Sequence, residues 1–244
     1  MRKILHLLTF SLLFSGCATH TADKNNFKNY NDFGVLAFFS QNMPIQFNAF
    51  SARNSKTVSA DIGSWDIAAV LTAELESQLK GMNKDLKKVT VDPVKVKTEL
   101  DEARNLNAVY LGDRYQILDQ YLLTEAGTQG AKYLFILHPV SLETFPQHKG
   151  GFGFICNSSK NSKGELEGYA LYRTELWNVK TQSVDRRITI TPAEMSFKTG
   201  KSCQETKNIS PDKLAALYKE DFMSLAKNSI TLMLQKASAP IDNR

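Results

Sequence analysis

Residues 131–139, AKYLFILHP, give the clearest strand signal of the chain, and they decide the predicted fold. Lys132 and His138 are the only strongly polar residues, and each stands near one end of the run. A continuous apolar run of this length is typical of a central strand that is buried on both faces of a sheet. We therefore predict a strand from Ala131 to Pro139 at the centre of a sheet.

Six further segments are predicted as strands by apolar runs or by alternation of apolar and polar residues. Phe33–Ser40, FGVLAFFS, is followed by a turn signal at residues 41–44 and then by Ile45–Phe50, so these two strands are expected to form a hairpin. Tyr169–Val179, YALYRTELWNV, alternates as a strand with one buried and one wet face, and Ser183–Thr191 returns beside it. The remaining two are Lys88–Val91 and Phe152–Cys156.

The clearest helix runs from Ser64, a suitable N-cap, to Gly81, a suitable C-cap. Its apolar residues recur every fourth position and form one stripe, Ile67, Leu71, Leu75 and Leu79. The other expected helices are Val94–Asn105, Asp113–Ala126 and one that opens at Ser210-Pro211 and runs to about residue 236.

The order of these elements predicts an α/β fold in which helices pack on a mixed sheet of about five to seven strands. The length of the chain and its ordinary composition, 42% hydrophobic and 23% charged, suit a single globular domain over residues 33–236. We expect a polar tether over residues 17–32 and a frayed C-terminus over residues 237–244.

The N-terminus, MRKILHLLTFSLLFSGC, has the pattern of an export signal. Arg2 and Lys3 precede an apolar region from Ile4 to Phe14, which has the length of a signal peptide core and is too short to span a bilayer. Residues 1–16 are therefore predicted to be a cleaved signal. An ordinary signal peptide followed by a chance cysteine is the alternative.

The end of this signal, Leu13-Phe14-Ser15-Gly16-Cys17, resembles the lipobox of bacterial lipoproteins, although leucine is more usual than Phe14 at its position. The resemblance implies that Cys17 is acylated and becomes the first residue of the mature chain. Two or more acyl chains, such as palmitate, suffice for stable anchoring. Ala18, in place of aspartate, implies the outer membrane, with the domain in the periplasm.

The charge of the chain does not indicate a nucleic-acid partner. Loss of Arg2 and Lys3 lowers the formal net charge from +5 to +3 over 228 residues, which is a weak bias. We expect an ordinary mixed surface, contact with the membrane only through the lipid on Cys17, and no nucleic acid. The oligomeric state stays open.

Two cysteines remain in the mature domain, Cys156 and Cys203. An even pair in an oxidising compartment is a disulfide candidate, and this is the predicted state. Two separate thiols are the alternative. A redox site is disfavoured because the chain has no Cys-x-x-Cys motif.

The sequence contains no motif for a metal site or a cofactor. Of the four histidines, only His138 and His148 lie in the expected domain, and no zinc-binding spacing is present. Both are expected to be ordinary residues of a strand end and a loop. We therefore predict no metal ligands, no cofactor-binding residues and no catalytic residues.

Three weaker signals have structural explanations. Gly200-Lys201-Ser202 lacks the earlier glycine of a phosphate-binding loop, and the glycines of residues 150–153, GGFG, precede a strand and suit a flexible loop or hairpin. The carboxylate pairs are expected to be solvated, Glu74 and Glu76 on the polar side of a helix and Glu165 and Glu167 in a polar loop over residues 157–168.

The order of elements over about residues 33–235 resembles that of periplasmic α/β domains of envelope lipoproteins. These include the activators of penicillin-binding proteins, the N-terminal domain of TolB and the curli-secretion lipoproteins. The resemblance implies binding of a protein partner in the envelope rather than catalysis. It transfers no functional residue.

Two other functions stay open, a periplasmic hydrolase with dispersed catalytic residues and a subunit of a secretion assembly. A deep pocket that holds perturbed carboxylates or His138 would favour the hydrolase. A shallow apolar surface or an open strand edge would favour docking of a partner, for instance by strand addition.

Overall fold

The computed structural model describes residues 27–48, 55–96, 98, 111–157 and 164–239. The strands are β1 (Phe33–Ala37), β2 (Asn42–Asn48), β3 (Lys56–Asp61), β4 (Tyr133–Pro139), β5 (Gly151–Asn157), β6 (Glu165–Asn178), β7 (Ser183–Ile190) and β8 (Ser196–Ser202). The helices are η1 (Phe27–Asn29), η3 (Gly63–Trp65), α1 (Ile67–Gly81), α3 (Leu111–Thr128), α4 (Cys203–Thr206), α5 (Pro211–Leu217) and α6 (Lys219–Ser238).

The predicted α/β fold is confirmed: the eight described strands form one mixed sheet on which helices pack. The sheet is organised around β6, whose 14 residues pair with four neighbours. Its first half pairs with β5 and β8, and its second half pairs with β4 and β7, all antiparallel. Two smaller sheets are therefore stacked end to end along one long strand.

Strands β4 and β5 lie in line on the same side of β6. Pro139, the last residue of β4, is opposite Tyr172, and Gly151, the first residue of β5, is opposite Leu171. The intervening residues 140–149, which we call the strap, must therefore leave the sheet and return at nearly the same point. This return fixes the position of the site described below.

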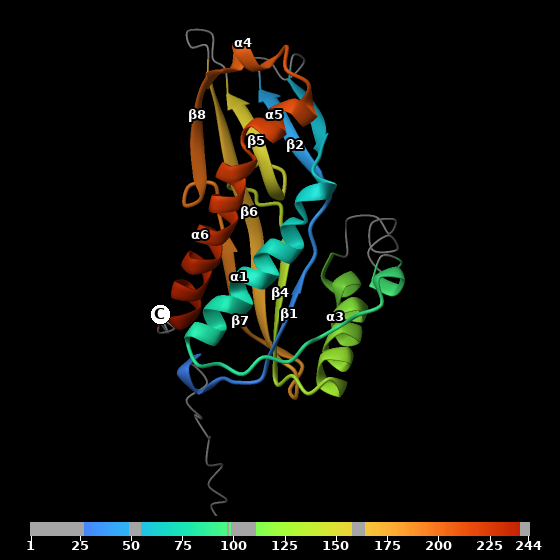
Figure 1. Ribbon diagram of the computed structural model, residues 1–244. Coiled ribbons are helices and arrows are strands. Elements are labelled where there is room, and N and C mark those ends of the chain that lie inside the picture. Colours follow the sequence, from blue (N-terminus) through green and yellow to red (C-terminus); the bar gives the residue numbers. More distant parts are fainter. Residues whose placement is uncertain (1–26, 49–54, 97, 99–110, 158–163, 240–244) are drawn as a thin grey trace, which may run out of the picture.

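One face of the sheet is covered by α1, α5 and α6, with α1 and α6 side by side (Figure 1). The predicted stripe of α1 is confirmed, because Ile67, Leu71, Leu75 and Leu79 are its buried residues. They share one core with the residues of α6 and with alternate residues of β4, Phe135 and Leu137.

The opposite face carries α3 at one end. Leu118, Leu122 and Ala126 of this helix pack against Leu134 and Ile136, the residues of β4 that alternate with those of the main core. The central strand is thus buried on both faces, as its apolar run predicts.

The expected hairpin of the first two strands is wrong. β1 pairs with β4 in parallel and β2 pairs with β5 in parallel, and both partners run antiparallel to β6. β1 and β2 therefore run in the same direction, and the chain continues through residues 38–41 without reversing. The predicted turn over residues 41–44 is replaced by the start of β2, which includes Pro44.

The strand expected at Lys88–Val91 is absent, and only Leu86 bridges β1, at Phe33. The backbone of Thr90 bonds to a side chain instead of a neighbouring strand. Its N–H donates to Gln129 Oε1 and its carbonyl oxygen accepts from Gln129 Nε2, both at 2.8 Å. The expected helix Val94–Asn105 lies mostly outside the described residues.

Three boundaries also differ from expectation. Phe27 and Tyr30 are buried in the core, so the expected tether over residues 17–32 ends before Phe27. The expected last helix is broken at Tyr218, whose ring packs edge-on against Phe154. The expected polar loop over residues 157–168 is shorter, because β6 begins at Glu165.

Two strands, β3 and β8, were not predicted. Their residues are mostly polar, and Ala60 is the single buried residue of β3. Each lies at an edge of the sheet, where polar residues are tolerated on both faces. At the C-terminus, α6 extends to Ser238 and Ala237 is buried, so the expected fraying at residue 237 does not begin there.

Candidate functional site

A large hollow lies on the face of the sheet that carries α3. It has a volume of about 720 Å³ and is bounded by α3 on one side and by the first residues of the strap on the other. We call it the α3 groove. Its floor is formed by β4, β6 and β7. This volume lies within the range of ligand-binding sites.

Strand alternation places four polar side chains on this floor. Arg173 and Glu175 of β6 line the groove, whereas the alternate residues Tyr172, Thr174 and Leu176 are fully buried. In the strand register, His138 of β4 is opposite Arg173. Arg187 of β7 is opposite Glu175, so the groove receives two arginines, a glutamate and a histidine from three adjacent strands.

Glu175 is already paired. Its Oε1 accepts from the Arg187 Nε at 2.9 Å, and its Oε2 accepts from the indole Nε1 of Trp177 at 3.1 Å. The Glu175 side chain is only 12% exposed, whereas Arg187 is 62% exposed, so the carboxylate is buried at one end of a charge-assisted pair that reaches solvent at the other. Glu175 is therefore held in place by two donors.

Asp119 of α3 faces the groove without such a partner. Burial, with the neighbouring Glu175 charge, raises the pKa of Asp119 to about 7, and Arg187 only partly offsets this rise. No hydrogen bond to the Asp119 carboxyl is found among the described residues. A carboxyl group with this pKa is partly protonated at neutral pH and can donate a hydrogen bond.

Arg173 is the least satisfied cation of the groove. Its Nε is buried and has no hydrogen-bond partner, and no ion pair joins its guanidinium to any side chain in the described part of the chain. A guanidinium carries five N–H donors in a planar fork. Arg173 therefore presents donors to the groove that the surrounding protein does not use.

His138 lies at the end of β4, as expected, but it also lines the groove. Its Nδ1 is 3.1 Å from the Pro139 carbonyl oxygen, so this nitrogen is the donor. Burial lowers the pKa of His138 below its ordinary value, and the ring is therefore neutral at neutral pH.

The strap is fastened to the sheet at Tyr169 of β6. The Tyr169 hydroxyl donates to Gln46 Oε1 at 3.2 Å and accepts from the Lys149 backbone N–H at 3.0 Å. The His148 ring packs edge-on against the Tyr169 ring with centroids 4.6 Å apart. His148 thus helps to pack the strap against β6.

The glycines at the base of the strap bring its two ends together. A Cβ at position 150 would lie 2.7 Å from the Val140 carbonyl oxygen, and Gly151 has a φ of 101°. Only glycine at position 150 avoids a clash with this oxygen, and glycine at position 151 adopts a φ that other residues rarely take. The expected flexible loop at GGFG is therefore wrong, since residues 151–153 are buried in β5.

Cys156 of β5 and Cys203 of α4 are joined by a disulfide, 47 residues apart in sequence. Both are buried, and they lie at the end of the sheet away from α3. The bridge therefore has a structural role apart from the groove. Cys17 lies outside the described residues.

The other motifs of the sequence have local explanations. Ser202 caps α4 through a capping box with Glu205, so Gly200-Lys201-Ser202 is a strand end and a helix cap. Glu74 accepts from Gln78 at 2.7 Å, and Glu165, in β6 rather than in a loop, pairs with Lys198 at 3.4 Å.

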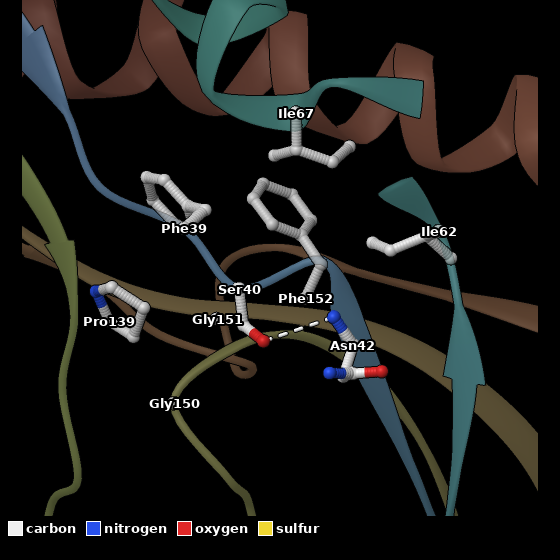
Figure 2. Close-up of a pocket in the computed structure, with 9 residues that line it drawn as sticks. All are labelled: Phe39, Ser40, Asn42, Ile62, Ile67, Pro139, Gly150, Gly151 and Phe152. Atoms are coloured by element: carbon white, nitrogen blue, oxygen red, sulfur yellow. Dashed lines mark hydrogen bonds between the residues drawn. The ribbon is translucent and has the colours of Figure 1, made fainter. Parts of the chain in front are cut away.

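A second pocket lies on the other face, beside the start of α1. Figure 2 shows Ile67 and Phe152 facing each other across it, next to the hydrogen bond from the Asn42 backbone N–H to Ser40 Oγ at 3.0 Å. Its volume is about 20 Å³, which is enough for one water molecule. It is too small to bind a ligand.

The described residues offer neither a metal cluster nor a membrane span. No group of three or more histidine, cysteine, aspartate or glutamate side chains is arranged to hold a metal ion. No helix in the described ranges is both long and apolar enough to cross a membrane.

The residues of the α3 groove were not singled out as a site in the sequence. In the sequence, Arg173 and Glu175 are polar residues on the solvent-facing side of an alternating strand, and Asp119 is a polar residue of a helix. His138 was identified, but as an ordinary strand-end residue. The signal that joins them is their proximity in the fold.

Comparison with known proteins gives no family: no family model and no curated protein matches the chain. Solved structures with similarity to it include the hypothetical protein CT253 from Chlamydia trachomatis, with 7% identity, coverage of 88% of this chain and 99% of that chain, and a TM-score of 0.42. The PelC dodecamer from Paraburkholderia phytofirmans aligns with 11% identity, 86% and 89% coverage, and a TM-score of 0.32.

The lipoprotein GNA1162 from Neisseria meningitidis aligns with 8% identity, 83% and 99% coverage, and a TM-score of 0.32. All three TM-scores are below 0.5, so no argument about function is drawn from these alignments.

Proposed function

We propose that this chain is a lipid-anchored protein of the bacterial cell envelope whose α/β domain binds a partner molecule in the α3 groove. The observation that carries the proposal is the groove itself. It is a hollow of about 720 Å³ whose walls combine apolar residues with Asp119 and Ser141 and whose strand floor carries four polar side chains. Such a combination is typical of a site that binds and orients a ligand.

The sequence supports the location. The export signal and the lipobox-like residues before Cys17 favour anchoring through acyl chains, and Ala18 favours the outer membrane. Phe27, where the described domain begins, is ten positions after Cys17, and a chain of that length can span at most about 35 Å. The domain is therefore expected to work close to the membrane surface.

The anchor is tested by Cys17→Ala. The wild-type chain is expected to incorporate labelled palmitate and to sediment with membranes, and the variant is expected to lose both properties. Membrane retention of the unlabelled variant would contradict the lipid anchor. This test does not depend on the groove.

The groove is tested by photocrosslinking in cells from Ser141, which is exposed and lines the groove. Ser224, exposed on α6 on the opposite face, is the matched control position. A discrete crosslinked product from position 141 that is absent from position 224 would support partner binding in the groove. Equal products, or none, from the two positions would contradict it.

A second candidate function, a hydrolase, is favoured by one observation. Asp119 is a carboxyl group with a pKa of about 7 that faces a groove with His138, which is the property of a general acid. Hydrolysis of chromogenic ester, phosphate or glycoside substrates that is abolished by Asp119→Asn would establish this candidate over simple binding.

A further inference from the structure

We infer that the α3 groove contains a subsite for an anionic group, a carboxylate or a phosphate, that is held by the guanidinium of Arg173. This inference rests on the proposed binding function of the groove and specifies the chemistry of its ligand. The ligand is expected to combine this anionic group with an apolar portion.

The first argument is the state of Arg173. This half-buried side chain makes no hydrogen bond or ion pair within the described residues, and its Nε is shielded from solvent. Buried polar groups in proteins are nearly always paired, and an unpaired one is costly. An acceptor supplied by a ligand would satisfy the guanidinium, and its planar fork fits carboxylate and phosphate oxygens.

The second argument is that the neighbouring groups leave Arg173 available. Glu175, the nearest anion along the strand, is already bonded to Arg187 and Trp177. His138, opposite Arg173, turns its Nδ1 to the Pro139 carbonyl, and burial keeps its ring neutral. Neither side chain neutralises the Arg173 charge.

The third argument is the α3 side of the same groove. Asp119 would repel an anion if it were ionised, but burial and Glu175 raise its pKa to about 7. In the protonated form it can donate to an anionic oxygen instead. Phe38, Leu122 and Ile136 line the same groove and provide apolar contact for the rest of the ligand.

Three probes of similar size test the inference on the full chain purified from cells. These are 3-phenylpropionate, 3-phenylpropyl phosphate and the uncharged 3-phenylpropanol, with inorganic phosphate as a probe of the anion alone. Binding is measured by calorimetry for wild type, Arg173→Gln, Arg173→Lys and the matched control Lys227→Gln. Lys227 is exposed on α6, on the other face, so its substitution removes the same charge away from the groove.

The wild type is expected to bind at least one of the two organic anions more tightly than the alcohol. Arg173→Gln should weaken anion binding about tenfold or more and leave the alcohol unaffected, because only the charge-assisted hydrogen bonds are lost. Arg173→Lys should be intermediate, and Lys227→Gln should equal wild type. The relative affinities of the two anions identify carboxylate or phosphate as the preferred group.

Equal binding of anions and alcohol, or loss of anion affinity in Lys227→Gln as large as in Arg173→Gln, would overturn the anionic subsite while leaving the groove as a binding site. Absence of binding by every probe would also overturn it. The crosslinking from Ser141 then decides separately whether the groove binds any partner. Thermal unfolding of each variant excludes loss of folding as the cause.

Discussion

Asp119 and Glu175 are two carboxyl groups of one groove, but their surroundings differ. Glu175 receives hydrogen bonds from Arg187 and Trp177. Asp119 is buried without such donors, and the negative charge of Glu175 disfavours a second ion nearby. The two carboxyl groups therefore differ: the glutamate on the strand is held by two donors, and the aspartate on the helix titrates near neutral pH.

This difference predicts a pH dependence of stability. The folded pKa of Asp119, about 7, is above its unfolded value near 4, so the folded state binds more protons between these values. The stability that Asp119 contributes is fully present below the unfolded pKa and is lost as the pH rises through about 7. Relative to wild type, Asp119→Asn should therefore become progressively more stable from pH 4 to pH 8.

Denaturant unfolding of both proteins at a series of pH values measures this difference. Asp66→Asn is not a suitable control because Asp66 caps α1, whereas Asp221→Asn changes an exposed carboxyl of α6. A difference between wild type and Asp119→Asn that does not change with pH would contradict a raised pKa for Asp119.

At the scale of elements, the strap depends on glycine. Its two ends meet where β4 stops and β5 starts, and the Val140 carbonyl oxygen occupies the place of a Cβ at position 150. Gly150→Ala must displace this backbone contact, and we expect it to destabilise the fold by about 1–3 kcal/mol. Chemical unfolding measures the change, and hydrogen exchange of the Lys149 amide reports opening of the strap.

Gly81→Ala is the matched control for this substitution. A Cβ at position 81 meets nothing within 4 Å at the end of α1, so alanine is expected to be neutral or to stabilise the helix by up to about 1 kcal/mol. Gly150→Ala with the same stability and exchange rate as wild type would mean that the strap ends can separate freely.

Prediction of elements from sequence succeeded where burial is strong. β4, β7 and α1 were expected close to their observed bounds, and β6 was expected with a start four residues too late, because each has a long face that must be apolar. The edge strands β3 and β8 were not predicted, because strands exposed to solvent can carry Lys, Ser and Thr and therefore lack an apolar pattern. The break of the last expected helix at Tyr218 was not predicted either, since the contact of its ring with Phe154 of β5 exists only in the fold.

At the scale of the molecule, β6 joins two half-sheets, and the disulfide secures the half that is farther from α3. Cys156 and Cys203 connect β5 to α4 across a sequence separation of 47 residues. Closing a loop of this size restricts the unfolded chain by about 4 kcal/mol in the loop-entropy model. Loss of the bridge should therefore lower the free energy of unfolding by about this amount.

The double variant Cys156→Ser/Cys203→Ser tests this prediction by denaturant unfolding, and non-reducing peptide mapping of the exported protein tests the bridge directly. A linked pair of peptides is expected. Recovery of two alkylatable thiols from exported protein would contradict the disulfide. The α3 groove should keep its ligand affinity in the variant, because the bridge lies at the other end of the sheet.

Local periodicity and residue type were enough to predict the α/β class, the central strand, the α1 stripe and the pairing candidates Cys156 and Cys203. The sequence also carries the lipobox-like signal at Cys17, whose test is biochemical. The direction of β1 and β2 could be learned only from the packed fold. They run the same way and form no hairpin, because each pairs in parallel with a strand that is distant in sequence. The packed fold likewise decided the groove, because Asp119, His138 and Arg173 meet only when β4, β6 and α3 pack together.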